Sequence, residues 1–310
     1  SAGPGIALMG EAMGLSTMTE IPLVVLDVQR GGPSTGIPTL TEQGDLNMCV
    51  FGAHGDAPRV VLAPTDVADA YEIGLLAFQL AEKYQTTVVV LSDQFIGQRK
   101  EALLPFAINE DEAAQRKVAK PSQEGPFKRF ELTSDGISPI PIPGTKGTAI
   151  QICGLEHNEM GNPTSSPILH ETMSDKRTNK LKPIESLDGA IWHYGETNAE
   201  HVIVSWGSTA GTASESIDRA RADGISCAVV APRVLTPLPV EALQKAIGKK
   251  AKTITVVELA HTGQLHNYLN SRIDWPVTPT SMRRSGGRPF GAKELHDFLI
   301  ETAGLAKKTA

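Results

Sequence analysis

Short runs of apolar and β-branched residues, alternating with helical periods, constrain the fold of this chain most. Leu23–Val28 and Thr86–Leu91 are nearly all apolar or β-branched and rich in valine, a composition typical of parallel strands buried on both faces. Arg59–Ala63 predicts another strand between them. A long amphipathic period then begins at Thr65, the expected N-cap, and runs to about Tyr84. Strands separated by helices in this way predict a doubly wound parallel sheet.

The sequence before and after this sheet follows the same logic. Apolar residues recur at helical spacing from Ile6 to Met18 and predict a helix with a wide buried face, and a short helix is expected over Thr41–Phe51. The alternation returns at residue 201. Strands are predicted at 202–206, 225–230 and 253–258, and helices at 208–222, 239–247, 263–273 and 292–304.

The stretch between the two alternating parts is irregular. Proline and glycine cluster there, and no long helical period is evident before Leu181. At 310 residues the chain exceeds the ~250–300 residues that one core usually spans. We therefore predict an α/β fold with a parallel-sheet domain over residues 1–115, a connector with a small insert over 116–197, and a second α/β domain over 198–310.

Composition excludes several classes of protein. With 29 Lys and Arg against 35 Asp and Glu, the net charge is −6, which argues against a partner made of nucleic acid or anionic membrane. No run approaches the ~20 apolar residues of a membrane helix, and no signal peptide is evident, so we expect a cytoplasmic protein. The three cysteines form no C-x-x-C pair. We expect no metal site within this chain, because zinc and iron–sulfur sites need about four clustered ligands.

The loop after the first predicted strand carries the most informative residues. Residues 29–36 read Q-R-G-G-P-S-T-G and follow the carboxyl end of that strand, where open α/β sheets bind ligands. Arg30 can hold a carboxylate through two parallel hydrogen bonds, the glycines allow close approach, and Ser34 and Thr35 add hydroxyls. The residues alone leave two interpretations open: a site for a small carboxylate, or a structural loop whose arginine pairs with an acid such as Asp27.

A second glycine-rich element opens the chain. Gly3, Pro4 and Gly5 form a turn before a predicted helix, so backbone amides and the helix dipole could face an anionic or polar ligand. A purely structural turn explains the same residues.

Taken in order, the motifs become specific. They are S-x-G-P-G, then M-T-E-x-P-L-V-V-x-D-V-Q-R-G-G-P-S-T-G-x-P-T, T-E-Q-x-D-L and G-x-H-G-D-A-P-R. This order closely resembles the α-subunit of 2-oxoacid:ferredoxin oxidoreductases, and the R-G-G-P-S-T-G form is most similar to the 2-oxoglutarate branch. The resemblance extends through G-L-E-H-N-E-M-G at residues 154–161 and covers essentially the whole chain.

What the resemblance implies is thiamine diphosphate chemistry divided between subunits. This chain would supply part of a pyrimidine-side domain and a transketolase C-terminal-like domain, and a β-subunit would hold the diphosphate with Mg²⁺ and a [4Fe–4S] cluster. A 2-oxo acid, 2-oxoglutarate foremost, would be oxidatively decarboxylated with CoA, and the electrons would pass to ferredoxin. Carried onto this sequence, Arg30 would bind the carboxylate of the 2-oxo acid. Thr35 would hydrogen-bond the substrate with Ser34 in the same loop, and the Gly3–Gly5 turn would lie near the cofactor.

The sequence departs from the family at its start. The Y-P-I-T-P segment and the cofactor-activating glutamate of the family lie upstream of S-x-G-P-G and are not in this sequence, so we expect an N-terminal part of the α-subunit to be missing. The expected assembly is a dimer of heteromers. Two other functions stay open: a subunit of a ferredoxin-independent thiamine-dependent dehydrogenase or transferase, and a scaffold subunit without catalytic activity.

Further polar residues are assigned structural roles. His54 is expected in a turn, and Asp93 is expected to cap or anchor the turn after its strand. His157, with Glu156 and Glu159 beside it, matches no zinc spacing and is expected to stabilise a loop.

Two further sets of polar or basic residues each allow two interpretations. Ser208 begins a helix that could hold a phosphate, although a helix start explains the residue equally well. Lys176, Arg177 and Lys180 are expected on a solvated face, with CoA phosphates or an acidic partner as the alternative. Glu20 is expected at a helix end or a subunit contact.

Overall fold

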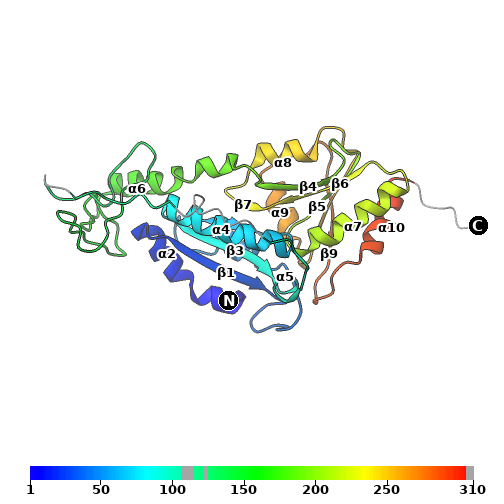
Figure 1. Ribbon diagram of the computed structural model, residues 1–310, viewed down its shortest axis with the longest axis horizontal. Helices are drawn as coiled ribbons and strands as arrows, with labels where there is room; N and C mark the ends of the chain where they lie inside the picture. Colours follow the sequence, from blue (N-terminus) through cyan, green and yellow to red (C-terminus); the bar gives the residue numbers. More distant parts are fainter. Residues whose placement is uncertain (106–114, 122–124, 305–310) are drawn as a thin grey trace, which may run out of the picture.

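The computed structural model describes residues 1–105, 115–121 and 125–304. Two β-sheets with helices on their faces confirm the predicted α/β fold (Figure 1). The first sheet has the order β1-β3-β2-β7. Its first three strands are parallel, as predicted, and β7 pairs antiparallel with β2. The strands are β1 (Leu23–Gln29), β2 (Val60–Leu62), β3 (Thr87–Asp93) and β7 (Val234–Thr236).

The central strands of this sheet are buried because their residues are apolar on both faces. The helix α4 (Val67–Tyr84) lies over one face and buries Ile73, Ala77 and Leu80 against it. Its N-cap is Asp66, whose carboxylate accepts a hydrogen bond from the amide of Asp69, so the predicted cap at Thr65 is one residue early. Two shorter helices complete this part: α3 (Leu46–Phe51) and α5 (Gln94–Gln98).

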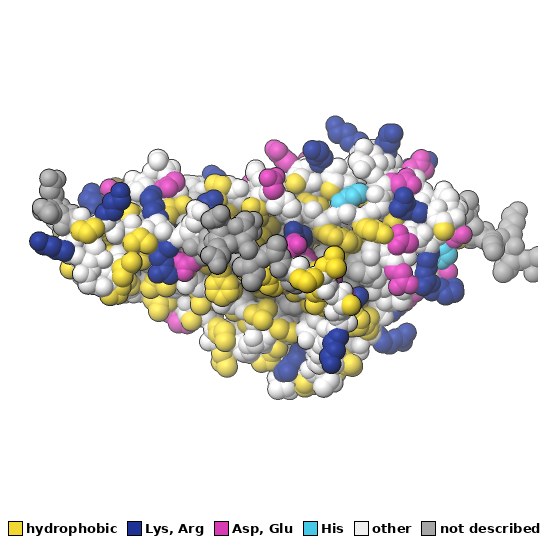
Figure 2. Space-filling view, in the orientation of Figure 1, with side chains coloured by type: hydrophobic (Ala, Val, Ile, Leu, Met, Phe, Trp, Pro, Cys, Tyr) yellow, Lys and Arg dark blue, Asp and Glu magenta, His cyan; other side chains and the backbone are white. Residues whose placement is uncertain are grey.

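The N-terminal helix differs from the prediction. It is divided at Met9 into α1 (Gly3–Leu8) and α2 (Gly10–Thr19). Its buried face is narrow, because Ile6 and Met13 are buried whereas Leu8 is 88% exposed. Apolar side chains gather along the lower edge of Figure 2, on the side where Figure 1 places these helices. The helix predicted from Thr41 begins only at Leu46, and residues 41–45 form no regular secondary structure.

The second sheet has the order β4-β6-β5-β8-β9, in which β4 alone is antiparallel to its neighbour. Helices α7 and α10 cover one face, and α8 and α9 cover the other. The strands are β4 (Ile191–Gly195), β5 (His201–Val204), β6 (Cys227–Pro232), β8 (Thr253–Glu258) and β9 (Thr280–Arg283). The helices are α7 (Ser208–Ala222), α8 (Val240–Ile247), α9 (Gln264–Asn270) and α10 (Ala292–Thr302).

The two sheets share one apolar core. Val25 and Leu91 of the first sheet belong to the same buried cluster as Val204 and Val256 of the second. Gln43, in the irregular segment before α3, reinforces this junction: its side-chain amide donates to the carbonyl of Trp206 at 2.7 Å and accepts from the amide of Leu259 at 2.9 Å. The N-terminal part is therefore held firmly against the C-terminal part.

The connector contains a helix that the sequence pattern did not predict. The helix α6 (Pro167–Asn179) and the following 3₁₀ helix η2 (Lys182–Ser186) lead back to the second sheet. The face that α6 buries carries Met173, Lys176 and Arg177, so apolar periodicity could not reveal it. The expectation that these two basic residues and Lys180 lie on a solvated face is wrong, because all three side chains are buried.

Within the described part of the chain, no helix has both the length and the hydropathy that a membrane span needs.

Candidate active site

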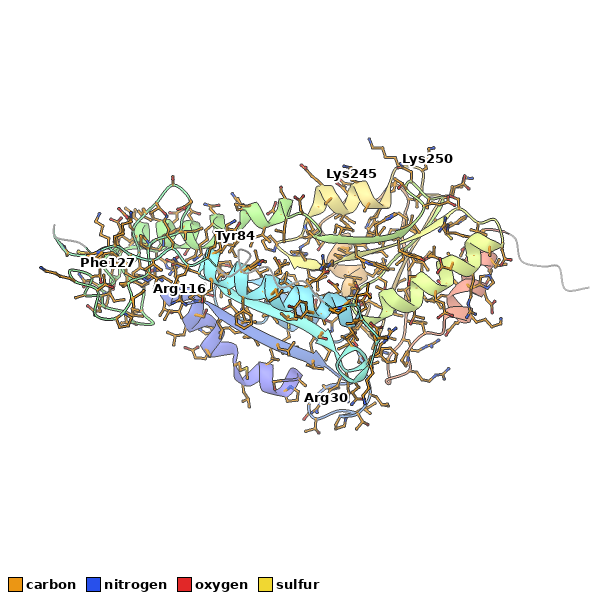
Figure 3. The ribbon with its side chains drawn as sticks, viewed as in Figure 1. Arg30, Tyr84, Arg116, Phe127, Lys245 and Lys250 are labelled. Carbon is orange, nitrogen blue, oxygen red and sulfur yellow. The ribbon has the colours of Figure 1, made fainter. Side chains whose placement is uncertain are left out.

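The Arg30 loop lies directly beyond the carboxyl end of β1, where Figure 3 labels it. The amide of Ile37 donates to the carbonyl of Gly31 at 2.7 Å, and the amide of Gly31 donates to the carbonyl of Leu40 at 3.0 Å. These bonds close the loop into a compact turn. Gln29, the last residue of β1, anchors its base, because its side chain donates to the carbonyl of Ser92 at 3.1 Å.

Gly36 allows the loop to close, and its replacement gives a first prediction. Its φ is +51°, and a Cβ placed there would lie 1.9 Å from the carbonyl oxygen of Gly31. Gly36→Ala is therefore expected to open the loop and to weaken ligand binding at least about tenfold, since both the backbone conformation and the contact become unfavourable. A binding titration checks this. Gly74→Ala, in α4 with no atom within 4 Å of the new Cβ, should bind normally, and equal binding by both variants would contradict the assignment.

A cavity of about 280 Å³ lies between this loop and the start of α1. It brings together two elements that the sequence singled out separately, Gly3 with Pro4 and the Arg30 loop with Ser34. Gly3 and Pro4 form the first turn of α1 itself, so the turn expected before the helix is part of the helix. Gly5 and Thr35 are not among its lining residues. The lining consists of Gly3, Pro4, Ala7, Arg30, Gly31, Gly32, Pro33, Ser34, Asp45 and Met48.

Arg30 supplies the positive group of this cavity. Its Nε is buried and has no hydrogen-bond partner, although a buried polar group normally has one. Arg30 and Asp27 form no ion pair, so the alternative of a structural loop held by that pair does not describe this geometry. A guanidinium that lines a cavity and has no partner among the described residues is suited to a carboxylate, which can accept two parallel hydrogen bonds from it.

An acidic side chain that the sequence reasoning missed, Asp45, also lines this cavity. The carboxylate of Asp45 packs against Gly3, where an added Cβ would lie 3.0 Å from Asp45 Oδ2. Burial, and then the neighbouring charge of Glu42, raises the pKa of Asp45. Asp27 lies buried on β1, and burial together with Asp45 raises its pKa to about 7. The signal for Asp45 was its place in the T-E-Q-x-D-L motif, but the expected helix from Thr41 put it in a helix interior.

The other polar residues singled out from sequence have structural partners. Asp93 caps α5 by accepting from the amide of Ile96 at 3.1 Å, and it also accepts from the amide of Ser208 at 2.9 Å. The Ser208 amide at the start of α7 therefore has a hydrogen-bond acceptor within the chain. His157 Nδ1 lies 3.0 Å from the carbonyl oxygen of Leu155 and stabilises its loop as expected.

His54 lies on an exposed turn at the edge of another cavity, of about 290 Å³, and its Nε2 is 3.5 Å from Glu11 Oε2. Within residues 1–105, 115–121 and 125–304, no three His, Cys, Asp or Glu side chains are grouped so that they could hold a metal ion.

The comparisons with known proteins agree with this geometry. Residues 1–175 match the family described as pyruvate flavodoxin/ferredoxin oxidoreductase, thiamine diphosphate-binding, and residues 199–297 match core domain II of pyruvate:ferredoxin oxidoreductase. The fold and the site thus define a thiamine diphosphate-dependent oxidoreductase family, and the chain belongs to it. Within that family it is similar to the α-subunits of 2-oxoacid:ferredoxin oxidoreductases.

Individual relatives make the relationship more specific. The 2-oxoglutarate synthase subunit KorA of Methanocaldococcus jannaschii is 34% identical over 271 residues, which cover 86% of this chain and 70% of that protein. The 2-oxoglutarate oxidoreductase subunit KorA of Mycobacterium tuberculosis is 36% identical over 312 residues, covering 100% of this chain and 46% of that protein. The chain therefore spans about half the length of several relatives that it matches.

A solved structure shows the same arrangement. The 2-oxoglutarate:ferredoxin oxidoreductase from Magnetococcus marinus, determined with 2-oxoglutarate, coenzyme A and succinyl-CoA bound, superimposes with a TM-score of 0.87 at 38% identity. The match covers 97% of this chain and 52% of that one.

The residues around the Arg30 cavity fit one side of a thiamine cofactor site. Pro4, Ala7 and Met48 give it apolar surface, and Gly3 leaves the backbone accessible. The described residues supply no hydrogen-bond acceptor to the buried Arg30 Nε. These walls suit a heterocycle with a bound carboxylate substrate beside it.

Proposed function

We propose that this chain is the α-subunit of a cytoplasmic enzyme that oxidatively decarboxylates 2-oxoglutarate with CoA. The products are succinyl-CoA, CO₂ and two reduced ferredoxins, so that the two electrons released with CO₂ are accepted singly. The observation that carries the proposal is Arg30, whose buried Nε has no hydrogen-bond partner, in a cavity shared with Gly3 and Pro4 at the start of α1. Arg30 binds the 1-carboxylate of the 2-oxo acid, and Ser34 and Thr35 offer hydroxyls in the same loop.

The choice of 2-oxoglutarate over other 2-oxo acids rests on relatives. Two of them are named as 2-oxoglutarate enzymes, and the Magnetococcus structure holds 2-oxoglutarate itself. Other relatives of similar identity are named only as 2-oxoacid:ferredoxin oxidoreductases. The first carboxylate is common to all 2-oxo acids. The Arg30 cavity therefore supports a 2-oxo acid as the substrate, and the relatives support 2-oxoglutarate among the 2-oxo acids.

The cofactors are divided between chains in this proposal. Thiamine diphosphate, when bound, would supply the carbanion chemistry for decarboxylation, and Gly3, Pro4 and Ala7 of this chain would face it. In this proposal a β-subunit holds the diphosphate, its Mg²⁺ and a [4Fe–4S] cluster. The cluster needs about four cysteine ligands, and this sequence has only Cys49, Cys153 and Cys227. Cys49 and Cys227 are buried in two different apolar clusters, which separates them from any common cluster site.

An assay of the assembled enzyme tests the proposal. The chain would be produced with the β-subunit encoded alongside it and with any further α-subunit sequence, and a low-potential viologen would replace ferredoxin. We expect reduction that requires both CoA and a 2-oxo acid, fastest with 2-oxoglutarate. Reduction of the viologen only by substrates other than 2-oxo acids would overturn the function, and faster reduction with pyruvate would overturn the choice of substrate.

A further inference from the structure

The Arg30 cavity has walls of opposite charge, and its acidic wall plays no part in the function proposed above. Asp45 lies at the N-cap position of α3, where an aspartate ordinarily accepts a hydrogen bond from the first turn of its helix. Its side chain makes no such bond. The carboxylate instead packs against Gly3 and lines the cavity. Arg30 and Asp45 do not pair with each other, so the cavity contains a separate cation and anion.

The position of Asp45 is fixed from several directions. Its amide donates to Gln29 Oε1 at 3.0 Å, and Gln29 is the residue next to Arg30 on the chain. The preceding residue, Gly44, accepts a hydrogen bond at its carbonyl from the side chain of Gln264, at 2.6 Å. The acidic wall is therefore held in register with the Arg30 loop by β1 and by the C-terminal part of the protein.

A second carboxyl group, that of Asp27, lies close enough to Asp45 for the two to influence each other's ionisation. Asp27 is fully buried on β1, its Oδ1 has no hydrogen-bond partner, and its Oδ2 lies 3.5 Å from the thiol of Cys49. No basic side chain pairs with either carboxyl group. A negatively charged group entering the cavity is thus attracted to the Arg30 side and repelled from the Asp45 side.

We propose that Asp45 is a specificity-determining residue of the Arg30 cavity. Its carboxylate admits one anionic group, which Arg30 binds, and keeps a second carboxylate out of the cavity. A long 2-oxo dicarboxylate then enters with its distal carboxylate directed away from Asp45, and a compact dicarboxylate, both of whose charges would fall within about 280 Å³, is rejected. This inference rests on the proposed function, because it takes a 2-oxo acid carboxylate as the ligand of Arg30.

Two unreactive four-carbon acids measure this effect directly. Butyrate and succinate differ by one terminal carboxylate, and their affinities for the assembled enzyme follow from calorimetric titration and from their inhibition constants against 2-oxoglutarate. Removing one like charge at this range is expected to raise the affinity of succinate relative to butyrate between about threefold and thirtyfold in Asp45→Asn. Asp45→Ser, which also suits an N-cap, should give the same change. Glu11→Gln, at an exposed carboxylate outside this cavity, should leave the ratio unchanged.

The outcomes separate the two claims. An unchanged ratio in both Asp45 variants would overturn the role of Asp45 while leaving the proposed function intact, provided that Arg30→Lys weakens both acids. Full retention of both affinities in Arg30→Lys, or failure of both acids to bind the wild-type enzyme, would overturn the proposed function and this inference with it.

Discussion

Replacing Arg30 by lysine is expected to lower kcat/KM for the 2-oxo acid by about a hundredfold or more. Lysine keeps the charge but offers a single point donor, so the two parallel hydrogen bonds to the carboxylate cannot both form. Arg30→Ala removes the charge as well and leaves the substrate carboxylate without a partner in a partly buried cavity, a loss of about 2–5 kcal/mol in comparable charge pairs. The expected order of kcat/KM is therefore wild type, then Arg30→Lys, then Arg30→Ala.

Steady-state kinetics on the assembled enzyme measure this effect. Loss of the ground-state contact alone would raise KM, whereas a contact that strengthens during decarboxylation would lower kcat as well. Arg99→Lys is a matched control, because Arg99 is a partly exposed arginine that pairs with Glu101 outside the cavity. Near-wild-type kcat/KM in Arg30→Lys would remove Arg30 from the site.

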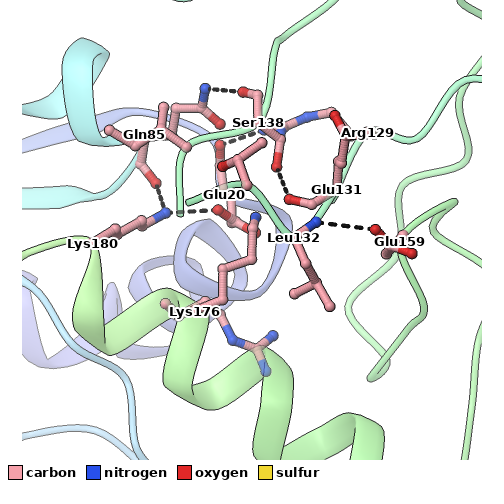
Figure 4. A network of polar contacts seen from close by, with 12 residues as sticks. Glu20, Gln85, Arg129, Glu131, Leu132, Ser138, Glu159, Lys176 and Lys180 are labelled. Atoms are coloured by element: carbon pink, nitrogen blue, oxygen red, sulfur yellow. Dashed lines mark hydrogen bonds and ion pairs between the residues drawn. The ribbon is translucent and has the colours of Figure 1, made fainter. Parts of the chain in front are cut away.

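Glu20→Gln is expected to destabilise the protein by about 3–5 kcal/mol. Figure 4 shows the reason. The carboxylate of Glu20, at the end of α2, lies 2.5 Å from Lys176 Nζ and 2.8 Å from Lys180 Nζ, and all three side chains are at most 3% exposed. Arg129 adds a third buried cation, donating to the backbone carbonyl of Glu20 at 2.7 Å. Removing the carboxylate leaves these cations uncompensated, and breaking a buried ion pair from one side has costs of this size.

The same cluster should make stability depend on acid pH. Burial alone would raise the pKa of Glu20, but the charges of Lys180 and Lys176 outweigh burial and lower it from 4.5 to about 2. A carboxyl group whose pKa is lower in the folded state stabilises the fold above its unfolded pKa. That contribution is present above about pH 4.5 and is lost as the pH falls toward 2. Glu20→Gln should therefore lose less stability than wild type across this interval.

Chemical denaturation at several pH values checks both statements. Glu241→Gln, at an exposed position on α8, is the matched control and should stay within about 0.5 kcal/mol of wild type. Lys180→Met should lower the free energy of unfolding less than Glu20→Gln does, because Glu20 still forms an ion pair with Lys176. A Glu20→Gln protein with wild-type stability at neutral pH would show that the cluster contributes nothing net.

Much of the fold followed from local pattern because the central strands are apolar on both faces. The range predicted for β1 lies within one residue of the observed strand at each end, and the range predicted for β3 lies within two. Thr253–Glu258 is β8 as predicted. The antiparallel edge strands β4 and β7 were missed. Edge strands owe their place to a neighbour distant in sequence, and β7, with three residues, is too short to show a period.

The buried charges explain the remaining differences between the predicted and the observed structure. The helix α6 gave no apolar signal because its buried face ends in ammonium and guanidinium groups, and only the position of Glu20, about 156 residues earlier, makes their burial tolerable. The Arg30 loop was found from sequence because arginine beside two glycines after a buried strand is a local signature. Asp45 was not, since its role depends on the approach of Gly3 from another part of the chain.

The proposed function depends on binding of a 2-oxo acid carboxylate by Arg30, and the affinity of an unreactive dicarboxylate tests that binding. The dissociation constant of glutarate, which carries the carboxylates of 2-oxoglutarate without its reactive carbonyl, can be measured by calorimetry for the assembled enzyme in wild-type and Arg30→Lys forms. We expect the wild-type enzyme to bind it and Arg30→Lys to bind it at least about tenfold more weakly. Equal affinity in the two proteins would contradict the account.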